Sequence, residues 1–263
     1  MCAKMKAFDF TIPGISVFRS WQWHHPDFLI QWQCFCNKNY QKDKQIWCTR
    51  LKDVKLLSVP TARGDCRVAF KCYREKSLLR YFLRPSLAAR EAAGFKIVES
   101  LHIPVAQVLA VGEKRCFFYL VEAYIVTRFE ENTESLLYFA DHPEEWDMLL
   151  ALLKENIARL GQLHAAGYTH GGAHPRNFLW RKNASGQLES LWIDLATVRQ
   201  MISGKKGWKY LLTDLADLVE NFRLSQNELD DLIAEYRKYN DIPVAYRERT
   251  DHEYKFSTVI HVG

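Results

Sequence analysis

The stretch HGGAHPRNFLW, residues 170–180, decides the fold of this chain and raises the main question about its function. A histidine and several small or polar residues run directly into a short apolar strand, and this order is typical of a catalytic loop. The position that usually holds an acid in such a loop is Gly172. The pair Gly171-Gly172 also has a structural explanation, because two glycines let the backbone make a tight turn with positive φ. The loop is therefore a working active site, an altered one, or only a tight turn.

The sequence around this stretch predicts a mainly helical second half. The expected elements are a helix over 146–166, strands over 178–180 and 188–193, and two helices within 211–239. Gly167 stands where the C-terminus of a helix favours a residue with positive φ. Asp194 follows the second strand, and Ser225 and Glu228 have the spacing of a capping box at the start of the last helix. Residues from 241 onward are expected to be irregular.

The first half has the alternating pattern of a sheet with one helix. The expected elements are two antiparallel strands within 46–74 that turn near 60–65, a helix from Pro85-Ser86 to about 101, a strand over 104–111, a turn over 112–114 and a strand over 116–127. The order of elements predicts an α+β fold with two lobes that meet near residue 129. The first lobe, 1–128, is β-rich, and the second, 129–263, is mainly helical.

The composition is that of an ordinary globular protein. Of the 263 residues, 48% are hydrophobic and 25% are charged, which is enough apolar material for one large domain or two lobes. No stretch reaches the roughly 18 uninterrupted apolar residues of a membrane-spanning helix. The N-terminal segment MCAKMKAFDFTIPG lacks the pattern of a secretory signal, so we expect a cytoplasmic protein.

The charge of the chain limits the classes of partner. A formal net charge of +5 favours an anionic ligand or an anionic membrane surface, although an ordinary basic surface explains it equally well. The chain has no run of five or more Lys and Arg residues and no pattern of interleaved basic and aromatic residues, so we do not expect it to bind nucleic acid.

The cysteines do not have the spacing of a disulfide scaffold or of a zinc site. The seven positions are Cys2, Cys34, Cys36, Cys48, Cys66, Cys72 and Cys116. Their number is odd and no Cys-x-x-Cys pair occurs, so we expect reduced thiols with a structural role.

Four features of the chain occur in an order that has chemical meaning. They are Lys71 at the end of the strand segment VAFK, Glu91 in the following helix, the loop from His170 to Asn177, and Asp194 after a strand. Each has an ordinary explanation alone, because Lys and Glu are usually solvated charges and an Asp after a strand often caps a helix. Together they match the protein-kinase order of strand Lys, helix Glu, catalytic loop ending in Asn, and metal-binding Asp. In such a site the Lys neutralises nucleotide phosphates and oxygen ligands hold Mg²⁺.

On these motifs the chain resembles the lipopolysaccharide kinase family, which includes Kdo and core-heptose kinases of the WaaP and InaA type. The segment REAAGFKIVESLHIPVAQVLAVGEKR (90–115) resembles the helix and the following strand of that family. The segments HAAGYTHGGAHPRNFLW (164–180) and LWIDLATVR (191–199) resemble its catalytic loop and its metal loop. The resemblance covers about residues 55–220 and is most specific over 164–199.

The resemblance implies a bilobal protein-kinase-like fold that uses ATP and Mg²⁺. It implies that Lys71 binds the phosphates with Glu91 as its partner, and that Asn177 and Asp194 are the metal ligands. Residues 128–131 would lie near the hinge beside the nucleotide cleft.

The chain departs from the family pattern at two places. The loop that would cover the nucleotide, near residues 60–67, has the single glycine Gly64. Gly172 stands at the position of the catalytic-base Asp. A positioned general base contributes about 10²–10⁴-fold, or about 3–5 kcal/mol, to the rate. Phosphoryl transfer depends mostly on positioning and on charge neutralisation, so the loop is altered rather than empty.

Two neighbouring side chains are candidates for the missing role. His174 has an unperturbed pKa near 6.5, which suits a group that accepts a hydroxyl proton or steadies the γ-phosphate. A loop histidine that packs against the neighbouring lobe is the alternative. Arg176 would pair with a phosphate or an anionic acceptor, and a surface salt bridge is its ordinary alternative.

Three functions are compatible with these residues. The first is an ATP-dependent kinase for a sugar of the bacterial lipopolysaccharide core, of the heptose or Kdo type, at the cytoplasmic face of the inner membrane. There the +5 charge would favour capture of a core oligosaccharide or a lipid-linked sugar. The second is a kinase-fold pseudoenzyme that binds nucleotide or a protein partner without efficient phosphoryl transfer. The third is a phosphotransferase for another small hydroxylated molecule.

The N-terminal residues 1–47 are rich in aromatic side chains. They include Trp21, Trp23, Trp32 and Trp47. These tryptophans complete the packing of the first lobe or form a platform for a sugar, and the sequence leaves both interpretations open.

Overall fold

The structure is a computed structural model of the chain. It describes residues 17–24, 44–48, 52–61, 64–74, 81–82, 84–116, 119–183, 185–201, 205–240, 244–249 and 253–258. The chain forms two compact units: the first comprises Met1–Ala88 and Leu109–Val126, and the second comprises Ala89–Val108 and Thr127–Gly263. The lobes 1–128 and 129–263 stay a prediction.

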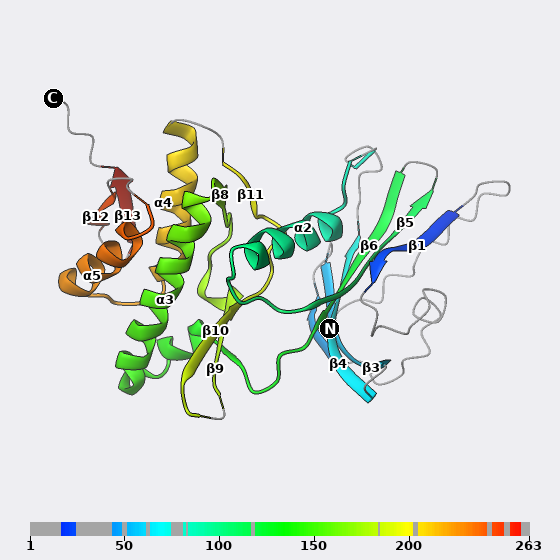
Figure 1. Ribbon diagram of the computed structural model, residues 1–263, viewed down its shortest axis with the longest axis horizontal. Coiled ribbons are helices and arrows are strands. Elements are labelled where there is room, and N and C mark those ends of the chain that lie inside the picture. Colours follow the sequence, from blue (N-terminus) through cyan, green and yellow to red (C-terminus); the bar gives the residue numbers. More distant parts are fainter. Residues whose placement is uncertain are drawn as a thin grey trace. The chain divides into compact units, whose positions relative to one another are not determined.

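The first unit contains a six-stranded sheet (Figure 1). Its strands are β1 (Val17–His24), β2 (Lys44–Cys48), β3 (Lys52–Thr61), β4 (Gly64–Arg74), β5 (Val108–Cys116) and β6 (Tyr119–Arg128), in the spatial order β1-β5-β6-β4-β3-β2. β3 and β4 pair antiparallel from Lys52 opposite Tyr73 to Thr61 opposite Gly64, which confirms the two strands predicted within 46–74. The buried core of this sheet includes Leu57, Val59, Val68, Leu109, Ala110 and Val126.

Strand β5 runs through the segment that the sequence predicted to be a turn. Gly112, Glu113 and Lys114 all pair with β1. Glu113 is only 4% exposed, because Arg115 Nε donates to its carboxylate at 2.6 Å and the Ser86 N–H donates at 3.4 Å. A strand is present over part of the predicted range 104–111, from Val108 onward, but the predicted turn over 112–114 is wrong, because the polar residues there are paired with β1.

The second unit contains most of the helices. They are α2 (Leu87–Ser100), which begins in the first unit, α3 (Trp146–Ala165), α4 (Lys205–Val219) and α5 (Gln226–Arg237). The shorter elements are β7 (Glu134–Ser135), β8 (Tyr168–Thr169), β9 (Phe178–Lys182), β10 (Leu188–Trp192), β11 (Arg199–Gln200), β12 (Val244–Arg249), β13 (Glu253–Thr258) and the 3₁₀ turns η1 (Leu136–Ala140), η2 (Pro143–Glu145) and η3 (Pro175–Asn177).

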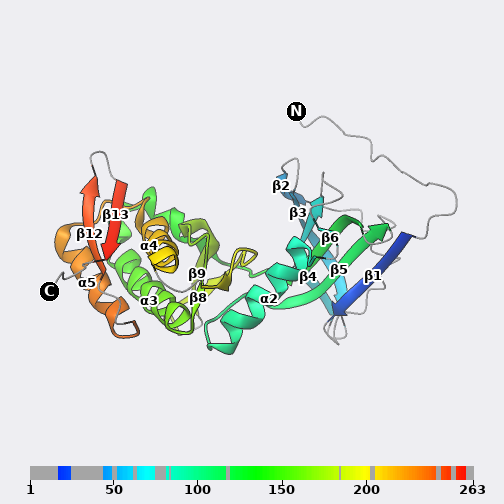
Figure 2. The ribbon, with the colours of Figure 1, turned by 90° about the horizontal axis from the view of Figure 1, so that it is seen from above.

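Helix α3 packs against both α4 and α5 (Figure 2). Its buried stripe includes Leu149, Leu153, Ile157, Leu160 and Leu163, at the helical spacing that the sequence predicted. Gly167 follows the helix with φ +84°, as predicted for a helix C-terminus. The predicted capping box at the start of α5 is also present, because the Ser225 N–H donates to Glu228 Oε2 at 2.6 Å and the Glu228 N–H donates to Ser225 Oγ at 3.4 Å.

The buried side chain of Asn156 holds the β9–β10 hairpin against α3. β9 and β10 pair antiparallel with Phe178 opposite Trp192, as the sequence predicted. Asn156 Nδ2 donates to Ser190 Oγ at 2.9 Å, and Asn156 Oδ1 accepts from Trp192 Nε1 at 2.7 Å. Buried polar groups that are satisfied in this way restrict a structure to one arrangement, so the hairpin has a defined position on the helix.

The C-terminal residues form a hairpin, which the sequence did not predict. β12 and β13 pair antiparallel from Val244 opposite Thr258 to Arg249 opposite Glu253, and β13 packs beside α4. The expectation of an irregular tail is therefore wrong. The sequence pattern did not reveal these strands because each is only six residues long and charged residues interrupt its apolar alternation.

Three expectations concern the chain as a whole. The two cysteines whose side chains are described, Cys66 and Cys72, are free, and burial raises the pKa of Cys72 to about 12. None of the described helices is long and apolar enough to cross a membrane. The tryptophan side chains of the segment 1–47 lie outside the described residues.

Candidate active site

The β9–β10 hairpin brings the two predicted metal ligands to one of its ends. Asn177 directly precedes β9, and Asp194 follows β10 after one intervening residue. The Ile193 N–H donates to the Asn177 carbonyl at 2.9 Å and so extends the pairing of the two strands to this end. The predicted ligands therefore lie at neighbouring backbone positions although 16 residues separate them in the sequence (178–193).

The side chain of Asn177 is oriented by the loop itself. It is 8% exposed, and its Nδ2 donates to the Gly172 carbonyl at 2.9 Å. Because the amide nitrogen is used in this bond, the amide oxygen Oδ1 is the atom that can face a cation. Amide and carboxylate oxygens are the ligands that Mg²⁺ prefers. The Asn177 amide oxygen and the Asp194 carboxylate are therefore donor groups of the kind that Mg²⁺ binds.

This donor set is incomplete without a nucleotide. Among the described residues, no group of three or more His, Cys, Asp and Glu side chains is arranged to hold a metal ion. Protein sites for Mg²⁺ in phosphoryl transfer usually supply one or two ligands and leave the rest to phosphate oxygens and water. The pair Asn177 and Asp194 has this character.

Asp194 has an unusual backbone conformation. Its φ is +59°, in the left-handed region that few residues other than glycine adopt. The next helix, α4, starts only at Lys205, so the interpretation of Asp194 as a helix cap is wrong. Residues held in such conformations are concentrated at functional sites, where the surrounding structure compensates for the strain.

Asp214 on α4 is the buried residue that holds the start of the loop 170–177. Its Oδ2 accepts from the His170 N–H and its Oδ1 accepts from the Gly171 N–H, both at 2.7 Å. His164 Nε2 lies 3.2 Å from Oδ2, and the His164 Nδ1 is bonded to the Tyr236 hydroxyl at 2.8 Å. A buried carboxylate is tolerated only when such partners replace its hydration. The sequence analysis missed Asp214, because an acid in an amphipathic helix is usually a solvated charge and nothing local shows that this one is buried.

The ring of His170 packs in the core. It is fully buried, with ring centroids 5.5 Å from Phe178 and 5.3 Å from Trp192. Burial lowers its pKa below the ordinary value of 6.5, so the ring is neutral. Neither ring nitrogen has a hydrogen-bond partner among the described residues. His170 therefore anchors the start of the loop and does not transfer protons.

The structure requires glycine at one of the two loop positions, 171 and 172, but not at the other. Gly171 has φ +71°, and a Cβ there would lie 2.9 Å from the Thr197 carbonyl oxygen. Gly172 does not have positive φ, and its Cβ would approach only the Thr197 Oγ1, at 3.2 Å. The prediction that both glycines serve a positive-φ turn is right for Gly171 and wrong for Gly172. The backbone thus leaves room for a side chain at position 172.

His174 contacts η3 on one side and lies near Glu220, the residue after α4, on the other. Its Nδ1 accepts from the Arg176 N–H at 3.3 Å, which makes it the N-cap of η3, and its Nε2 lies 3.6 Å from Glu220 Oε1. Burial and the positive charge of Arg176 lower its pKa, while Glu220 opposes this change, so the imidazole is neutral at pH 7. The side chain of Arg176 is exposed.

Two carboxylates, one on α4 and one just after it, contact opposite ends of the segment 170–174. Asp214 contacts His170 and Gly171, and Glu220 lies near His174, while Asp217 is spaced three residues from each. Burial, with the negative charges of Glu220 and Asp214, raises the pKa of Asp217 to about 6.

The predicted phosphate-binding residues lie in different units. Lys71 on β4 is 8% exposed and Glu91 on α2 is fully buried, which is unusual for solvated surface charges. Their pairing stays a prediction. Gly64 is the first residue of β4. Its φ of +109° favours glycine, whereas a Cβ there would meet no atom within 4 Å, so the backbone conformation and not close packing explains the glycine.

Helix α2 approaches the metal loop closely within the second unit. A Cβ at Gly94 would lie 2.2 Å from the Leu195 carbonyl oxygen, so only glycine permits this contact. Glu91 lies one helical turn before Gly94. Backbone packing thus links the helix that carries the predicted Glu to the residue after Asp194.

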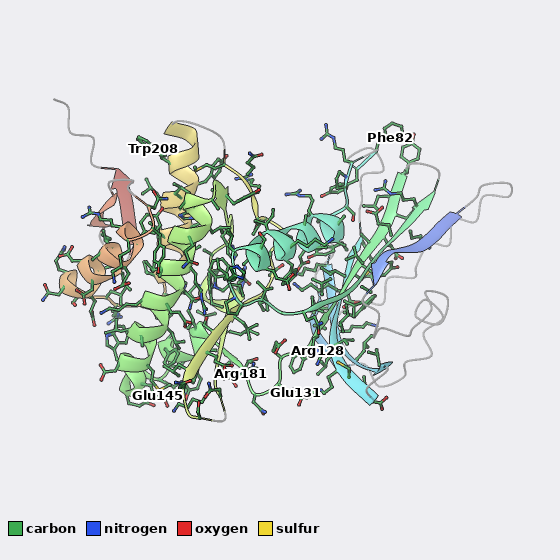
Figure 3. All side chains as sticks on the ribbon, viewed as in Figure 1. Phe82, Arg128, Glu131, Glu145, Arg181 and Trp208 are labelled. Carbon is green, nitrogen blue, oxygen red and sulfur yellow. The ribbon has the colours of Figure 1, made fainter. Side chains whose placement is uncertain are left out.

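The predicted hinge residues adjoin β6 and β9. The Arg128 N–H donates to the Gln107 carbonyl at 2.8 Å. Arg181 on β9 donates to Glu130 at 3.3 Å, and Arg128, Glu131 and Arg181 can be followed in Figure 3. Their role as a hinge stays a prediction.

Comparison with known proteins identifies the family. The lipopolysaccharide kinase (Kdo/WaaP) family matches residues 71–236, more than half of the chain, and this range contains the loop, both predicted metal ligands and Asp214. The chain belongs to this family. Its membership supports a kinase in general, and it confirms the resemblance that the sequence motifs indicated.

A solved structure confirms the fold of this lipopolysaccharide kinase family member. WaaP in complex with acyl carrier protein is similar with a TM-score of 0.55 and 17% sequence identity, over 75% of this chain and 79% of that chain. The predicted α+β, protein-kinase-like fold is therefore confirmed. No curated protein sequence matches the chain significantly.

We expect the two glycines to respond differently to substitution. Gly171→Ala forces positive φ on a side chain and brings it against backbone, so the free energy of unfolding should fall by about 1–3 kcal/mol or more. In Gly172→Ala the new Cβ would approach only the Thr197 hydroxyl, which can move, so the free energy of unfolding should change by no more than about 1 kcal/mol. Urea unfolding of both variants measures this, and equal losses would contradict the distinction.

Asp217 should make stability depend on pH in a defined direction. Its folded pKa of about 6 lies above the ordinary 3.8, so stability is full below about pH 4 and is lost as pH rises through 6. Asp217→Asn should therefore raise the free energy of unfolding at pH 7.5 by about 1 kcal/mol, after discounting for solvent exposure, and have no effect below about pH 4. Urea unfolding across pH tests this, with the exposed Asp230→Asn as control. A constant difference at all pH values would refute the assignment.

Proposed function

We propose that the protein is an ATP- and Mg²⁺-dependent kinase that phosphorylates a sugar of the lipopolysaccharide core, of the heptose or Kdo type. The observation that carries this proposal is the placement of Asn177 and Asp194 at one end of the β9–β10 hairpin, beside a loop that Asp214 holds by two backbone bonds. Family membership and this donor set support it together.

The proposed roles follow from the chemistry of each side chain. Asn177 Oδ1 and the Asp194 carboxylate would hold the metal, which when bound neutralises the charge on the phosphates. Lys71, kept in place by Glu91, would neutralise the α- and β-phosphates. Gly64 would lie in the loop that covers the nucleotide.

The acceptor hydroxyl needs a proton acceptor, because Gly172 removes the usual Asp. We propose His174 for this role, since its imidazole is neutral at pH 7 and lies two residues from the vacant position. Arg176, whose side chain is exposed, would bind a phosphate or an anionic group of the acceptor. The acceptor would be a core oligosaccharide or a lipid-linked sugar, met at the cytoplasmic face of the inner membrane.

A kinase-fold pseudoenzyme is the second candidate, and two observations favour it. Position 172 carries no side chain, and both nitrogens of His174 already face other groups, the Arg176 N–H and Glu220. Such a protein would bind nucleotide or a protein partner without efficient transfer. A phosphotransferase for another small hydroxylated molecule would retain the same loop and differ only in its acceptor.

Binding of Mg·ATP should raise the melting temperature of the wild-type protein. A nucleotide at about 100 times its Kd stabilises a protein by about 2.7 kcal/mol, which corresponds to about 5 °C or more for a chain of this size. Asp194→Asn should abolish the Mg-dependent part of the shift, because it removes a charged ligand. The exposed Asp141→Asn serves as the control and should keep the full shift.

Incubation with core oligosaccharides and Mg·ATP, followed by mass spectrometry, tests the acceptor. A phosphorylated heptose or Kdo supports the kinase. Nucleotide binding without product from any acceptor supports the pseudoenzyme, and absence of any Mg·ATP shift refutes both nucleotide-dependent functions.

Restoring the acid at position 172 separates the enzyme from the pseudoenzyme. We expect Gly172→Asp to fold, because the backbone there is ordinary, and to raise phosphoryl transfer by up to about 10²-fold. If His174 is the working base, His174→Asn should lower wild-type transfer by about 10²-fold but have little effect in the Gly172→Asp background. Asn remains a good N-cap, so retention of wild-type activity in His174→Asn would assign His174 to capping and not to proton transfer.

A further inference from the structure

Arg199 is an exposed cation beside the loop 170–177 that has no role in the functions described so far. It lies on β11 and pairs with Thr169 on β8, the residue directly before the loop, and the two strands lie side by side in Figure 1. Thr197, two residues earlier in the chain, approaches Gly171 within the loop. Arg199 is therefore next to the start of the loop, in the same compact unit.

Hydrogen bonds on both sides of Arg199 fix its backbone. The Val198 N–H donates to the Leu195 carbonyl at 3.2 Å, and the Met201 N–H donates to the Gly167 carbonyl at 2.7 Å. Val198 is buried and Leu195 is fully buried, so the segment before Arg199 is anchored in the core. The side chain of Arg199 therefore starts from a defined position at the edge of the candidate site.

The guanidinium group of Arg199 is held by an aromatic ring. Its Cζ lies 4.2 Å from the centroid of the Tyr210 ring on α4, which is within the range of a cation–π contact. Within the described part of the chain this is the one interaction of the Arg199 side chain, and no carboxylate pairs with it. Stacking restricts the plane of the guanidinium and leaves the N–H donors at its edge for another partner.

A stacked arginine of this kind is suited to bind an anion. The planar fork of its N–H groups matches a carboxylate or a phosphate, to which it donates two parallel hydrogen bonds. Because the ring of Tyr210 has already restricted the side chain, less conformational freedom is lost when an anion binds. Lys209, the residue before Tyr210, is also exposed and adds positive charge to this side of α4.

We propose that Arg199 is a specificity-determining residue that binds an anionic group of the acceptor sugar. A phosphorylated heptose presents this group as a phosphate, and Kdo presents it as a carboxylate. This inference rests on the proposed kinase function. It adds to the role proposed for Arg176 on the loop, because here a ring outside the loop holds the cation before the acceptor binds.

NMR of arginine side chains tests binding without turnover. With ¹⁵N-labelled arginine, the Nε–H signal of Arg199, assigned by its loss in Arg199→Gln, should shift on titration with heptose phosphate or with Kdo. Free heptose, which carries no charge, should leave it unchanged, and so should all three sugars for the signal of the exposed Arg237 on α5. The sugar that shifts the signal identifies the anionic group as phosphate or carboxylate. A shift with neither anionic sugar, or an equal shift with free heptose, overturns the proposal.

Kinetics with the phosphorylated acceptor test the consequence. Arg199→Gln should raise the KM for the anionic acceptor by about 10- to 100-fold, because a charge-assisted hydrogen bond is lost, and leave the KM for Mg·ATP nearly unchanged. Arg199→Lys keeps the charge without the fork and should recover part of the loss. Arg237→Gln is the matched control and should change neither KM. An unchanged acceptor KM in Arg199→Gln, or an equal rise in the KM for Mg·ATP, overturns the specificity role.

Two substitutions at Tyr210 test whether the ring holds the cation. Tyr210→Phe keeps the ring face and should leave the acceptor KM unchanged. Tyr210→Leu removes the ring and should raise the acceptor KM by about 2- to 5-fold. Equal acceptor KM values in the two variants overturn the role of the ring.

The two proposals can fail separately. If no acceptor is phosphorylated, the kinase function fails, and the NMR titration still decides whether Arg199 binds the anion. If anionic and neutral acceptors are phosphorylated equally well and Arg199→Gln has no effect, only the specificity role fails.

Discussion

The loop 170–177 depends on one buried carboxylate. Asp214 accepts the backbone N–H groups of His170 and Gly171, and its own burial is compensated by His164. Removing either partner of a buried, charge-assisted bond leaves the other without compensation, which is costly. Since His164 lies on α3 and Asp214 on α4, this interaction also joins two helices at the loop. The position of Asn177, six residues after Gly171, follows from it.

The candidate site has two features: a hairpin end that brings together Asn177 and Asp194, and a loop that carries glycine at position 172. In the proposed kinase, the amide oxygen of Asn177 and the carboxylate of Asp194 at the hairpin end would be the oxygen ligands of a metal, which when bound neutralises charge in phosphoryl transfer. Gly172 leaves the proposed site without the usual acid at this position, and a positioned general base contributes about 3–5 kcal/mol. Gly171 is required by the close approach of Thr197, whereas Gly172 is not. The loss of the acid is thus a chemical difference and not a consequence of backbone geometry.

Several elements could be predicted because their signals are local. The stripe of α3, the capping box of α5 and the β9–β10 hairpin depend on spacing within a few residues. The errors have a different origin. The turn predicted over 112–114 is part of β5 because β1 pairs with it and Arg115 neutralises the buried Glu113, and a pattern of polar residues does not reveal such partners. The short C-terminal strands had too few alternating residues to be recognised.

The sequence by itself determined the family, because motif order along the chain carries that information, and it singled out Lys71, Glu91, Asn177 and Asp194 as candidate site residues, which stay predictions. Only the tertiary structure decided which residues act on the loop. Asp214 and Glu220 contact residues at least 43 positions away, and contacts at such separations leave no periodic signal in a single sequence. The contact with Thr197 is also invisible in the sequence. The Thr197 carbonyl oxygen lies too close to position 171 for any residue but glycine, whereas position 172 has room for a side chain.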